Sequence, residues 1–328
     1  MQRREFIAFL GGMAMAAPIA AKAETPEKVF RLAVVSPVGL MPEASPNAKV
    51  LLGALNGLGY TLGQNLIFEG PAGPSGRPLP PEKIIEQVKA KKVDLIVAWG
   101  FPVVAAAKAA GIPTVVAFGV GDPVATGLVQ NLAQPGDVIT GISDVATTLS
   151  TKRLGLLKDL LPKLSRVAML WNKDDLGMSL RYEASAKAAQ AIGADVEAVG
   201  VREPDDFNEA FTVMDKEAPD AILMVSDSLT MLNRERVFDY AAAHRLPAIY
   251  EFDSLVREGG LMSYGADLKE SFERAAAMVD RIFKGAKPGD LPFEQPTRYL
   301  FVINLKTAKS IGLEIPPNLL ALADEVIE

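Results

Sequence analysis

The sequence of 328 residues contains no cysteine and a single histidine, His244. Without cysteine the chain can form no disulfide, offer no thiol nucleophile and carry no lipid on a cysteine. Zinc and related metals prefer thiolate and imidazole ligands, so we expect no metal site. His244 falls at the expected end of a helix, where a cation suits the helix dipole, and this role is favoured over base catalysis.

Motifs of catalysis and nucleotide binding are missing as well. The sequence has no Gly-x-Ser-x-Gly elbow and no Gly-x4-Gly-Lys-Ser/Thr loop, and Gly119-x-Gly121 lacks the third glycine of a dinucleotide fingerprint. We therefore expect no catalytic residue, no cofactor and no enzymatic activity. The formal net charge is −6 and no strongly basic run occurs beyond the N-terminus, which argues against nucleic acid as a partner.

The first 23 residues have the pattern of an export signal. Arg3 and Arg4 precede a short apolar run rich in glycine and alanine, which ends at the small residues of Ala21-Lys22-Ala23. This run is too short to span a bilayer. The sequence predicts a cleaved signal peptide over 1–23, a mature start at Glu24 and a mature net charge of about −8. The arginine pair favours the twin-arginine route, although the ordinary secretory route stays open.

Apolar runs of strand length alternate with helical patterns along the mature chain. The first series has expected strands at 30–35, 65–69, 94–99 and 114–118, with helices at 46–58, 81–91 and 103–110. The second series has expected strands at 166–171, 195–201, 220–225 and 246–250, with helices at 180–192, 206–217 and 230–244. Continuous apolar strands separated by helices indicate parallel sheets covered on both faces. We therefore expect an α/β chain with two doubly wound parallel-sheet lobes.

Two further strand–helix pairs follow, at 260–264 with 269–283 and at 297–304 with 305–311. If each lobe takes one pair, the chain crosses between the lobes three times and makes a three-segment hinge. We place the crossings near Ser143-Asp144, near Glu251-Phe252 and within 285–296, which is rich in glycine and proline. The predicted lobes are then 24–144 plus 252–290 and 145–251 plus 291–328.

Ligands of parallel sheets bind beyond the carboxyl ends of the strands. Two facing sheets therefore predict an interlobe cleft lined by the residues that follow each strand. The candidates are Ser36, Trp99, Gly100, Phe101, Pro102, Asp122, Trp171, Asn172, Ser226, Asp227, Tyr250, Glu251 and Tyr264.

Several candidates have a second interpretation. Pro102 suits the first turn of a helix whose free N–H groups could hold a carboxylate, while Phe101 could be simple core. Trp99 and Trp171 could stack on a ligand or only cap the sheets. Asp227 could bind an ammonium group or cap the next helix.

The remaining candidates divide in the same way. Ser36 could bind a ligand or merely end its strand, and Asn172 could orient a polar group. Glu251 could bind a ligand or belong to the hinge, and Asp122 could simply make a turn.

Four segments together resemble the ABC-transporter substrate-binding family. They are residues 122–129 (DPVATGLV), 135–143 (PGDVITGIS), 302–309 (VINLKTAK) and 312–317 (GLEIPP). The resemblance covers essentially the whole mature chain. It implies a type I periplasmic binding fold, ligands such as aromatic or other amino acids, and a permease at the inner membrane as partner. Because no lipid-bearing cysteine is present, we expect a freely diffusing periplasmic monomer.

The candidate loops contain no Lys or Arg, which disfavours phosphate and other highly charged ligands. We expect a small carboxylate-bearing ligand, with an apolar or aromatic amino acid as the leading class. Two alternatives stay open. The chain could serve a membrane sensor instead of a transporter, or it could be a periplasmic isomerase or lyase that uses carboxylates.

Overall fold

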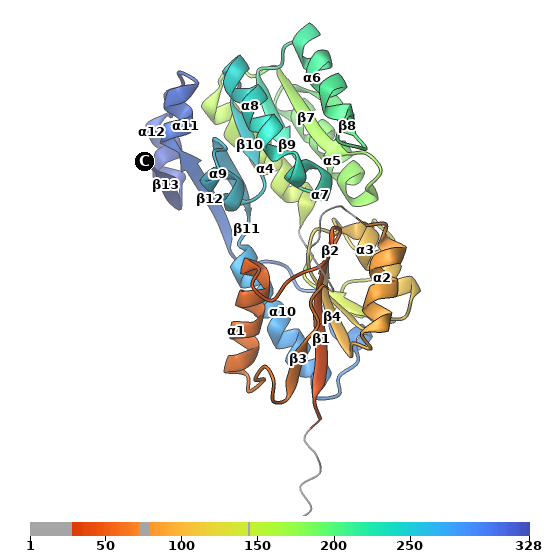
Figure 1. Ribbon diagram of the computed structural model, residues 1–328. Coiled ribbons are helices and arrows are strands. Elements are labelled where there is room, and N and C mark those ends of the chain that lie inside the picture. Colours follow the sequence, from red (N-terminus) through yellow and green to blue (C-terminus); the bar gives the residue numbers. More distant parts are fainter. Residues whose placement is uncertain (1–27, 72–78, 144) are drawn as a thin grey trace, which may run out of the picture.

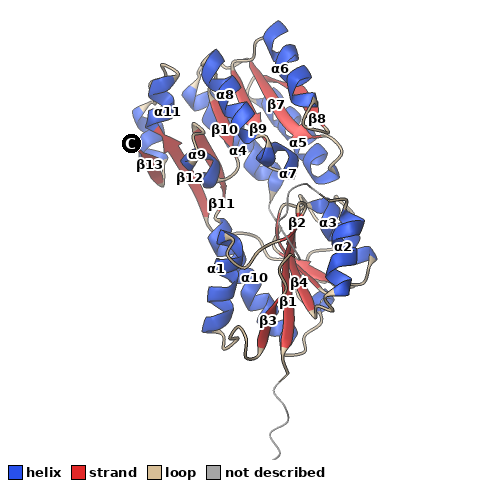
Figure 2. Cartoon of the chain, viewed as in Figure 1, coloured by secondary structure: helices blue, strands red, loops and turns tan. Residues whose placement is uncertain are grey.

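The computed structural model describes residues 28–71, 79–143 and 145–328. The predicted signal peptide and Asp144 lie outside the described residues. The described chain forms two α/β lobes, one above the other in Figure 1. Figure 2 shows that each lobe has a sheet between layers of helices, as the alternating sequence pattern predicts.

The sheet of the first lobe has the order β2-β1-β4-β5-β6, with β3 paired to β1. Its strands are β1 (Phe30–Ser36), β2 (Gly39–Leu40), β3 (Leu66–Phe68), β4 (Leu95–Trp99), β5 (Thr114–Phe118) and β6 (Ile139–Gly141). The pairs are parallel except β1 with β2. The longer strands agree with the expected runs to within one residue, whereas the three-residue β6 was not predicted.

Helices cover both faces of this sheet. They are α1 (Pro46–Gly57), α2 (Pro81–Ala90), α3 (Phe101–Ala109) and α10 (Leu268–Phe283). Successive side chains of a strand point to opposite faces. Leu32 and Val34 of β1 therefore pack with α1 and α10, and Ala33 and Val35 pack with α2 and α3. Each fully buried Leu or Val contributes about 1.5–3 kcal/mol.

The sheet of the second lobe has the order β13-β12-β11-β10-β9-β7-β8. Its strands are β7 (Arg166–Asn172), β8 (Asp195–Val201), β9 (Ala221–Met224), β10 (Ala248–Tyr250), β11 (Met262–Ala266), β12 (Tyr299–Asn304) and β13 (Glu325–Ile327). β12 runs antiparallel to β11, so this sheet is mixed rather than purely parallel.

Helices again lie on both faces. α4 (Ala146–Leu160), α5 (Leu176–Ala191), α11 (Leu305–Ser310) and α12 (Pro317–Leu322) contribute to one core, and α6 (Asp206–Lys216), α8 (Arg234–His244) and α9 (Asp253–Arg257) to the other. The single helix expected over 230–244 is two helices, α7 (Ser228–Leu232) and α8, because the chain leaves helical geometry at Asn233.

The chain passes between the lobes after β6, after β11 and between residues 294 and 299. The sequence-based placement of the second crossing near Glu251-Phe252 is wrong. β11 pairs in parallel with β10, so the chain stays in the second lobe until Ala266. Residues 291–294 also stay with the first lobe, where the Phe293 amide donates to the Leu132 carbonyl.

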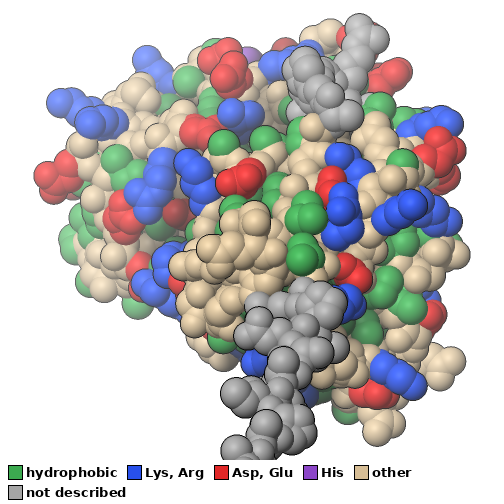
Figure 3. Space-filling model, turned by 60° about the horizontal axis from the view of Figure 1, so that its bottom comes forward, with side chains coloured by type: hydrophobic (Ala, Val, Ile, Leu, Met, Phe, Trp, Pro, Cys, Tyr) green, Lys and Arg blue, Asp and Glu red, His purple; other side chains and the backbone are tan. Residues whose placement is uncertain are grey.

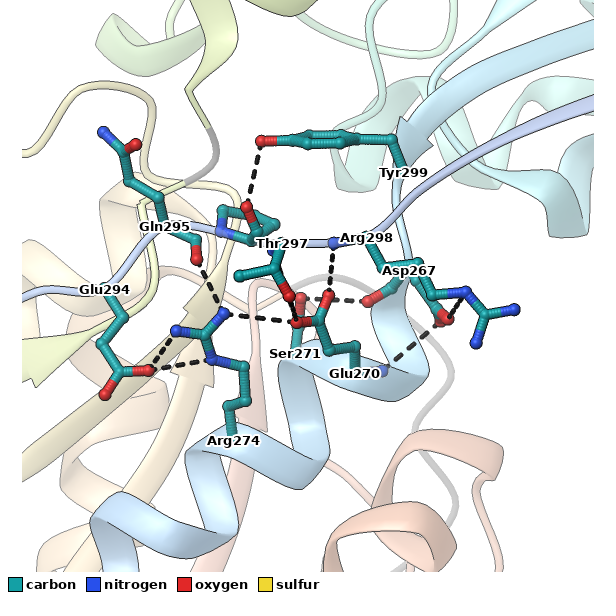
Figure 4. Close-up of polar contacts among 10 residues, drawn as sticks. Asp267, Glu270, Ser271, Arg274, Glu294, Gln295, Thr297, Arg298 and Tyr299 are labelled. Atoms are coloured by element: carbon teal, nitrogen blue, oxygen red, sulfur yellow. Dashed lines mark hydrogen bonds and ion pairs between the residues drawn. The ribbon is translucent and has the colours of Figure 1, made fainter. Parts of the chain in front are cut away.

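A polar cluster ties the second and third crossings to the start of α10 (Figure 4). Arg274 Nε donates to Glu294 at 2.8 Å, and Arg274 Nη1 donates to the Gln295 carbonyl at 2.8 Å. The Arg298 amide donates to Glu270 at 2.8 Å, and Asp267 caps α10. Both crossing segments are therefore fixed relative to one helix of the first lobe.

The surface carries charges of both signs. On the face drawn in Figure 3, acidic and basic side chains are interspersed rather than gathered by sign. Within the described ranges, no helix has both the length and the apolarity needed to cross a bilayer.

Candidate functional site

A cavity of about 450 Å³ lies between the lobes and is lined from both. The first lobe contributes Ser36, Pro37, Val38, Met41, Ser45, Pro46, Asn47, Trp99, Gly100, Phe118, Gly119 and Leu268. The second lobe contributes Asp175, Met178, Ser226, Asp227, Ser228, Met231, Leu232, Arg234, Phe252, Asp253 and Ser254. This volume is within the range of small-molecule sites.

Much of the cavity wall is apolar. Trp99 and Phe118 stack with ring centroids 5.3 Å apart, and Phe252 of the second lobe meets Phe118 edge-to-face at 5.5 Å. Met41 and Met231 also line the cavity, and methionine adapts to irregular shapes because its side chain is unbranched and flexible. These walls suit a flat or bulky apolar group.

The first lobe presents the start of α3 to the cavity. Gly100, at the N-cap, has φ +83° and no side chain to cap the helix. A Cβ at this position would lie 2.4 Å from Pro37 Cγ, so the close approach requires glycine. The N–H groups of a helix start attract negative charge. Ser36 contributes less than expected, because its hydroxyl already donates to the Gly39 carbonyl at 3.1 Å.

The second lobe presents two carboxylates. Asp175 caps α5 by accepting from the Met178 amide at 3.3 Å, and Asp227 caps α7 by accepting from the Leu229 amide at 2.6 Å. Burial, followed by repulsion from Asp227, raises the pKa of Asp175 to about 7. Burial also raises the pKa of Asp227 to about 6, against the effect of its amide donors. Such carboxylates favour a cationic partner.

Two further polar side chains line the second-lobe wall. Ser226 is 7% exposed, and its hydroxyl has no hydrogen-bond partner among the residues that the structure describes. Arg234 also lines the cavity, which the sequence analysis did not foresee. Its guanidinium is engaged by Glu258 and by the Met231 carbonyl. With Asp253 included, carboxylates outnumber cations in the lining.

Glu251 lies behind this wall rather than on it. It is 2% exposed and accepts from Arg153 at 3.0 Å, from Arg181 at 2.8 Å and from the Ser226 amide at 3.0 Å. Arg153 also donates to the Tyr264 carbonyl of β11 at 2.7 Å. The network therefore connects the cavity wall to the strand that leads into the second crossing.

The structure brings five of the predicted residues to the cavity: Ser36, Trp99, Gly100, Ser226 and Asp227. Asp227 both caps α7 and lines the cavity, so its two interpretations are compatible. The others among the predicted residues are not in the lining.

Core packing and local hydrogen bonds account for these others. Phe101 packs against the first-lobe core and Pro102 follows it in α3. Asp122 accepts from the Val124 amide in a turn. The backbone N–H of Asn172 donates to Asp227 Oδ2 at 3.1 Å.

Three aromatic candidates are also engaged elsewhere. Trp171 stacks on Tyr182 at 4.2 Å, Tyr250 is buried against Phe238, and the Tyr264 ring packs near Tyr299. Hydrophobic packing of the second lobe therefore explains these rings without a ligand.

Sequence reasoning missed Asp175, Met41, Met231 and Phe252, which lie a few residues beyond the strand ends. The sequence does contain a signal that could have identified Asp175. It follows an expected strand by a few residues and precedes a helical pattern, which is the position of a helix N-cap.

The sequence of the chain matches one known protein family. A sequence profile for the family described as ABC transporter substrate binding protein matches residues 45–327. A curated relative, the tyrosine-binding protein of Clostridioides difficile (strain R20291), is 25% identical over 275 residues, which cover 83% of this chain and 78% of that protein.

Solved structures agree across both lobes. A conserved domain protein from Vibrio cholerae O1 biovar eltor has a TM-score of 0.82 and 26% identity, covering 91% of this chain and 100% of that one. The ABC domain from Streptococcus pneumoniae in complex with L-Trp has a TM-score of 0.80 and 25% identity, covering 92% and 100%.

Proposed function

The chain belongs to the family of ABC transporter substrate-binding proteins, and we propose that it is the exported receptor for an α-amino acid with a large apolar or aromatic side chain. Proteins of this family bind substrates and are not enzymes, so the cavity is a binding site and not an active site. The proposed partner is an inner-membrane ABC permease, and the proposed working form is a periplasmic monomer released by cleavage near Glu24.

This proposal rests on the opposite charge preferences of the two cavity walls. Asp175 and Asp227 offer negative charge from the second lobe, while the first lobe offers the start of α3 without an acidic cap. A zwitterion matches both walls, because its ammonium group pairs with the carboxylates and its carboxylate accepts from backbone N–H groups. A ligand with both charges would bridge the lobes.

The apolar part of the cavity wall suits the side chain of the proposed amino-acid ligand. Trp99, Phe118 and Phe252 supply aromatic surface, and methionines fill the space around them. Phosphates and dicarboxylates are disfavoured, because the lining has more carboxylates than cations and its Arg234 is already paired with Glu258. The relatives named as tyrosine-binding or solved with L-Trp support the same ligand class.

Calorimetric titration with a matched ligand series tests the proposal. Phenylalanine, tyrosine and tryptophan are compared with phenethylamine, which lacks the carboxylate, and 3-phenylpropanoate, which lacks the ammonium group. We expect at least one of the amino acids to bind and each truncated ligand to bind more than about tenfold more weakly, since loss of a charged hydrogen bond costs about 1.5–3 kcal/mol.

A hexose is the control for aromatic stacking alone. If the hexose or phenethylamine binds as tightly as the best amino acid, zwitterion recognition is wrong. If phosphate or a dicarboxylate binds best, the charge assignment of the two walls is wrong.

A further inference from the structure

The two lobes come into backbone contact beside the cavity, at Gly121 and Gly177. Gly121 follows β5 in the first lobe, and Gly177 is the second residue of α5 in the second lobe. A Cβ on Gly121 would lie 3.4 Å from Gly177 Cα, and a Cβ on Gly177 would lie 3.3 Å from the Val120 carbonyl oxygen. A side chain larger than alanine at position 177 therefore meets the backbone of the first lobe.

The backbone conformation of α5 does not call for glycine at this position. Gly177 has no positive φ, and it lies in the first turn of a helix of 16 residues. Glycine costs about 0.5–1 kcal/mol relative to alanine inside a helix. A Cβ here would crowd two groups, the Val120 carbonyl oxygen of the first lobe at 3.3 Å and Asp175 Oδ1 of the helix cap at 3.2 Å.

The same contact helps to enclose a cavity residue. Asp175 caps α5 two residues before Gly177, lines the cavity and is only 4% exposed. A Cβ on Gly177 would lie 3.2 Å from Asp175 Oδ1, so the contact point and the carboxylate are immediate neighbours. Moving Val120 and Gly121 away would uncover this part of the wall.

We infer that the contact of Gly177 with the Val120–Gly121 backbone is the closure point of the cleft, where the absence of side chains lets the lobes enclose the ligand and bury Asp175 against its ammonium group. This inference rests on the proposed function for the nature of the ligand. The geometry of the closure point itself is independent of which ligand binds.

The first test replaces Gly177 with Leu, a good helix former whose Cβ would lie 3.3 Å from the Val120 carbonyl oxygen of the first lobe and 3.2 Å from Asp175 Oδ1. Gly53→Leu is the matched control, because Gly53 lies in α1, is exposed and has nothing within 4 Å of an added Cβ. Apparent affinity falls with the fraction of molecules able to close. We expect Gly177→Leu to weaken the best amino acid about tenfold or more and to abolish its compaction in small-angle scattering.

The ligand-free Gly177→Leu protein should keep the circular dichroism spectrum of the wild type, and Gly53→Leu should bind normally. Wild-type affinity and compaction of Gly177→Leu would overturn the inference. If that variant does not fold, Gly177→Ala gives the same comparison, with a smaller loss of affinity expected and unchanged affinity as the opposing result.

The second test needs no ligand. Because the chain has no cysteine, the double variant Gly121→Cys/Gly177→Cys allows a single intramolecular disulfide. Oxidation should link the lobes within a monomer, detected as a mass loss of two hydrogens and protection from alkylation. Absence of this link in the folded double variant, both without ligand and with a saturating amino acid, would overturn the closure point even if wild type binds amino acids. A link in a protein that binds no amino acid would instead retain the closure point and reject the proposed function.

Discussion

Asp175 and Asp227 begin two different helices of the second lobe and line the same cavity. Their mutual repulsion adds to the effect of burial and raises the pKa of Asp175. Neither carboxylate has an arginine or lysine of its own in the described structure, since Arg153 and Arg181 are taken up by Glu251. The pair is therefore poised to accept a cation from a ligand.

Asp175→Asn should weaken binding of the best amino acid by more than about tenfold, because a charged hydrogen bond contributes about 1.5–3 kcal/mol. Asparagine retains the oxygen that caps α5, so thermal stability near pH 4, where the folded Asp175 is protonated, should change little. Asp227→Asn should behave alike, whereas Asp227→Ala should also lose about 1 kcal/mol of stability with its cap. Calorimetry and thermal unfolding separate the two effects. Unchanged affinity in both asparagine variants would remove these carboxylates from the site.

Amino-acid affinity should fall as the pH decreases from 8 to 5. The pKa values of about 7 for Asp175 and about 6 for Asp227 mean that protons occupy these groups below neutral pH. An ammonium group must displace them, which costs up to about tenfold in affinity per pH unit for each proton released. Titrations in buffers of different ionisation enthalpy should detect the released protons. Affinity that is constant across this range would contradict ammonium binding at the pair.

The same pKa shift predicts the stability of the ligand-free protein. A folded-state pKa above the unfolded value of about 3.9 means that the folded protein binds more protons between pH 4 and 7. The contribution of Asp175 to stability therefore decreases as the pH rises through this window. Asp175→Asn should gain stability relative to wild type on going from pH 5 to pH 7, as measured by melting temperature. A difference that does not depend on pH would argue against a raised pKa.

Glu251→Gln should lower the free energy of unfolding by about 3–5 kcal/mol, because it removes the buried negative charge that Arg153 and Arg181 both contact. The control is Glu273→Gln, which removes an exposed ion pair with Lys269 on α10. That change should cost no more than about 0.5 kcal/mol. Urea unfolding of both variants measures the difference. Equal stabilities would mean that the buried network contributes no more than a surface pair.

Ligand binding should reduce the radius of gyration. The three crossings allow the lobes to rotate as nearly rigid bodies, and the cluster around Glu270 and Arg274 holds two crossing segments to the first lobe. Small-angle scattering with and without a saturating ligand measures the change. Identical profiles would indicate a cleft that does not open.

Export should remove the first 23 residues. N-terminal sequencing of protein from the periplasm should begin at or near Glu24, and Arg3→Lys with Arg4→Lys should block export by the twin-arginine route. Uncleaved protein that accumulates in the cytoplasm would contradict the signal peptide. Unaffected export of the double variant would instead indicate the ordinary secretory route.

The sequence predicted the two-lobed fold because its apolar runs have the length and spacing of parallel strands, as in β1, β4 and β5. It did not reveal to which sheet a strand belongs. The residues of β11 do not identify its sheet, and its pairing with β10 and β12 assigns it to the second lobe. The second crossing was misplaced for that reason.

The site was harder to predict than the fold. Strand ends pointed to Gly100 and Asp227, which line the cavity, and also to Trp171 and Tyr250, which pack in the second-lobe cores instead. Phe252 and Met231 lie in the lining because short helices return toward the cleft. Such returns depend on packing between distant segments, which a local sequence pattern does not contain.

The position of α10 has a consequence for the order of folding. Phe272 and Val279 complete the core beneath β1, β4 and β5, although the chain builds most of the second sheet before it reaches them. A nascent chain that ends before residue 268 lacks one cover of its first sheet, and the second sheet lacks β12 until residue 304. The first-lobe core is incomplete until α10 has been synthesised, and the second-lobe core is incomplete until β12 has been synthesised. We therefore expect both lobes to complete their cores late, after most of the polypeptide has been synthesised.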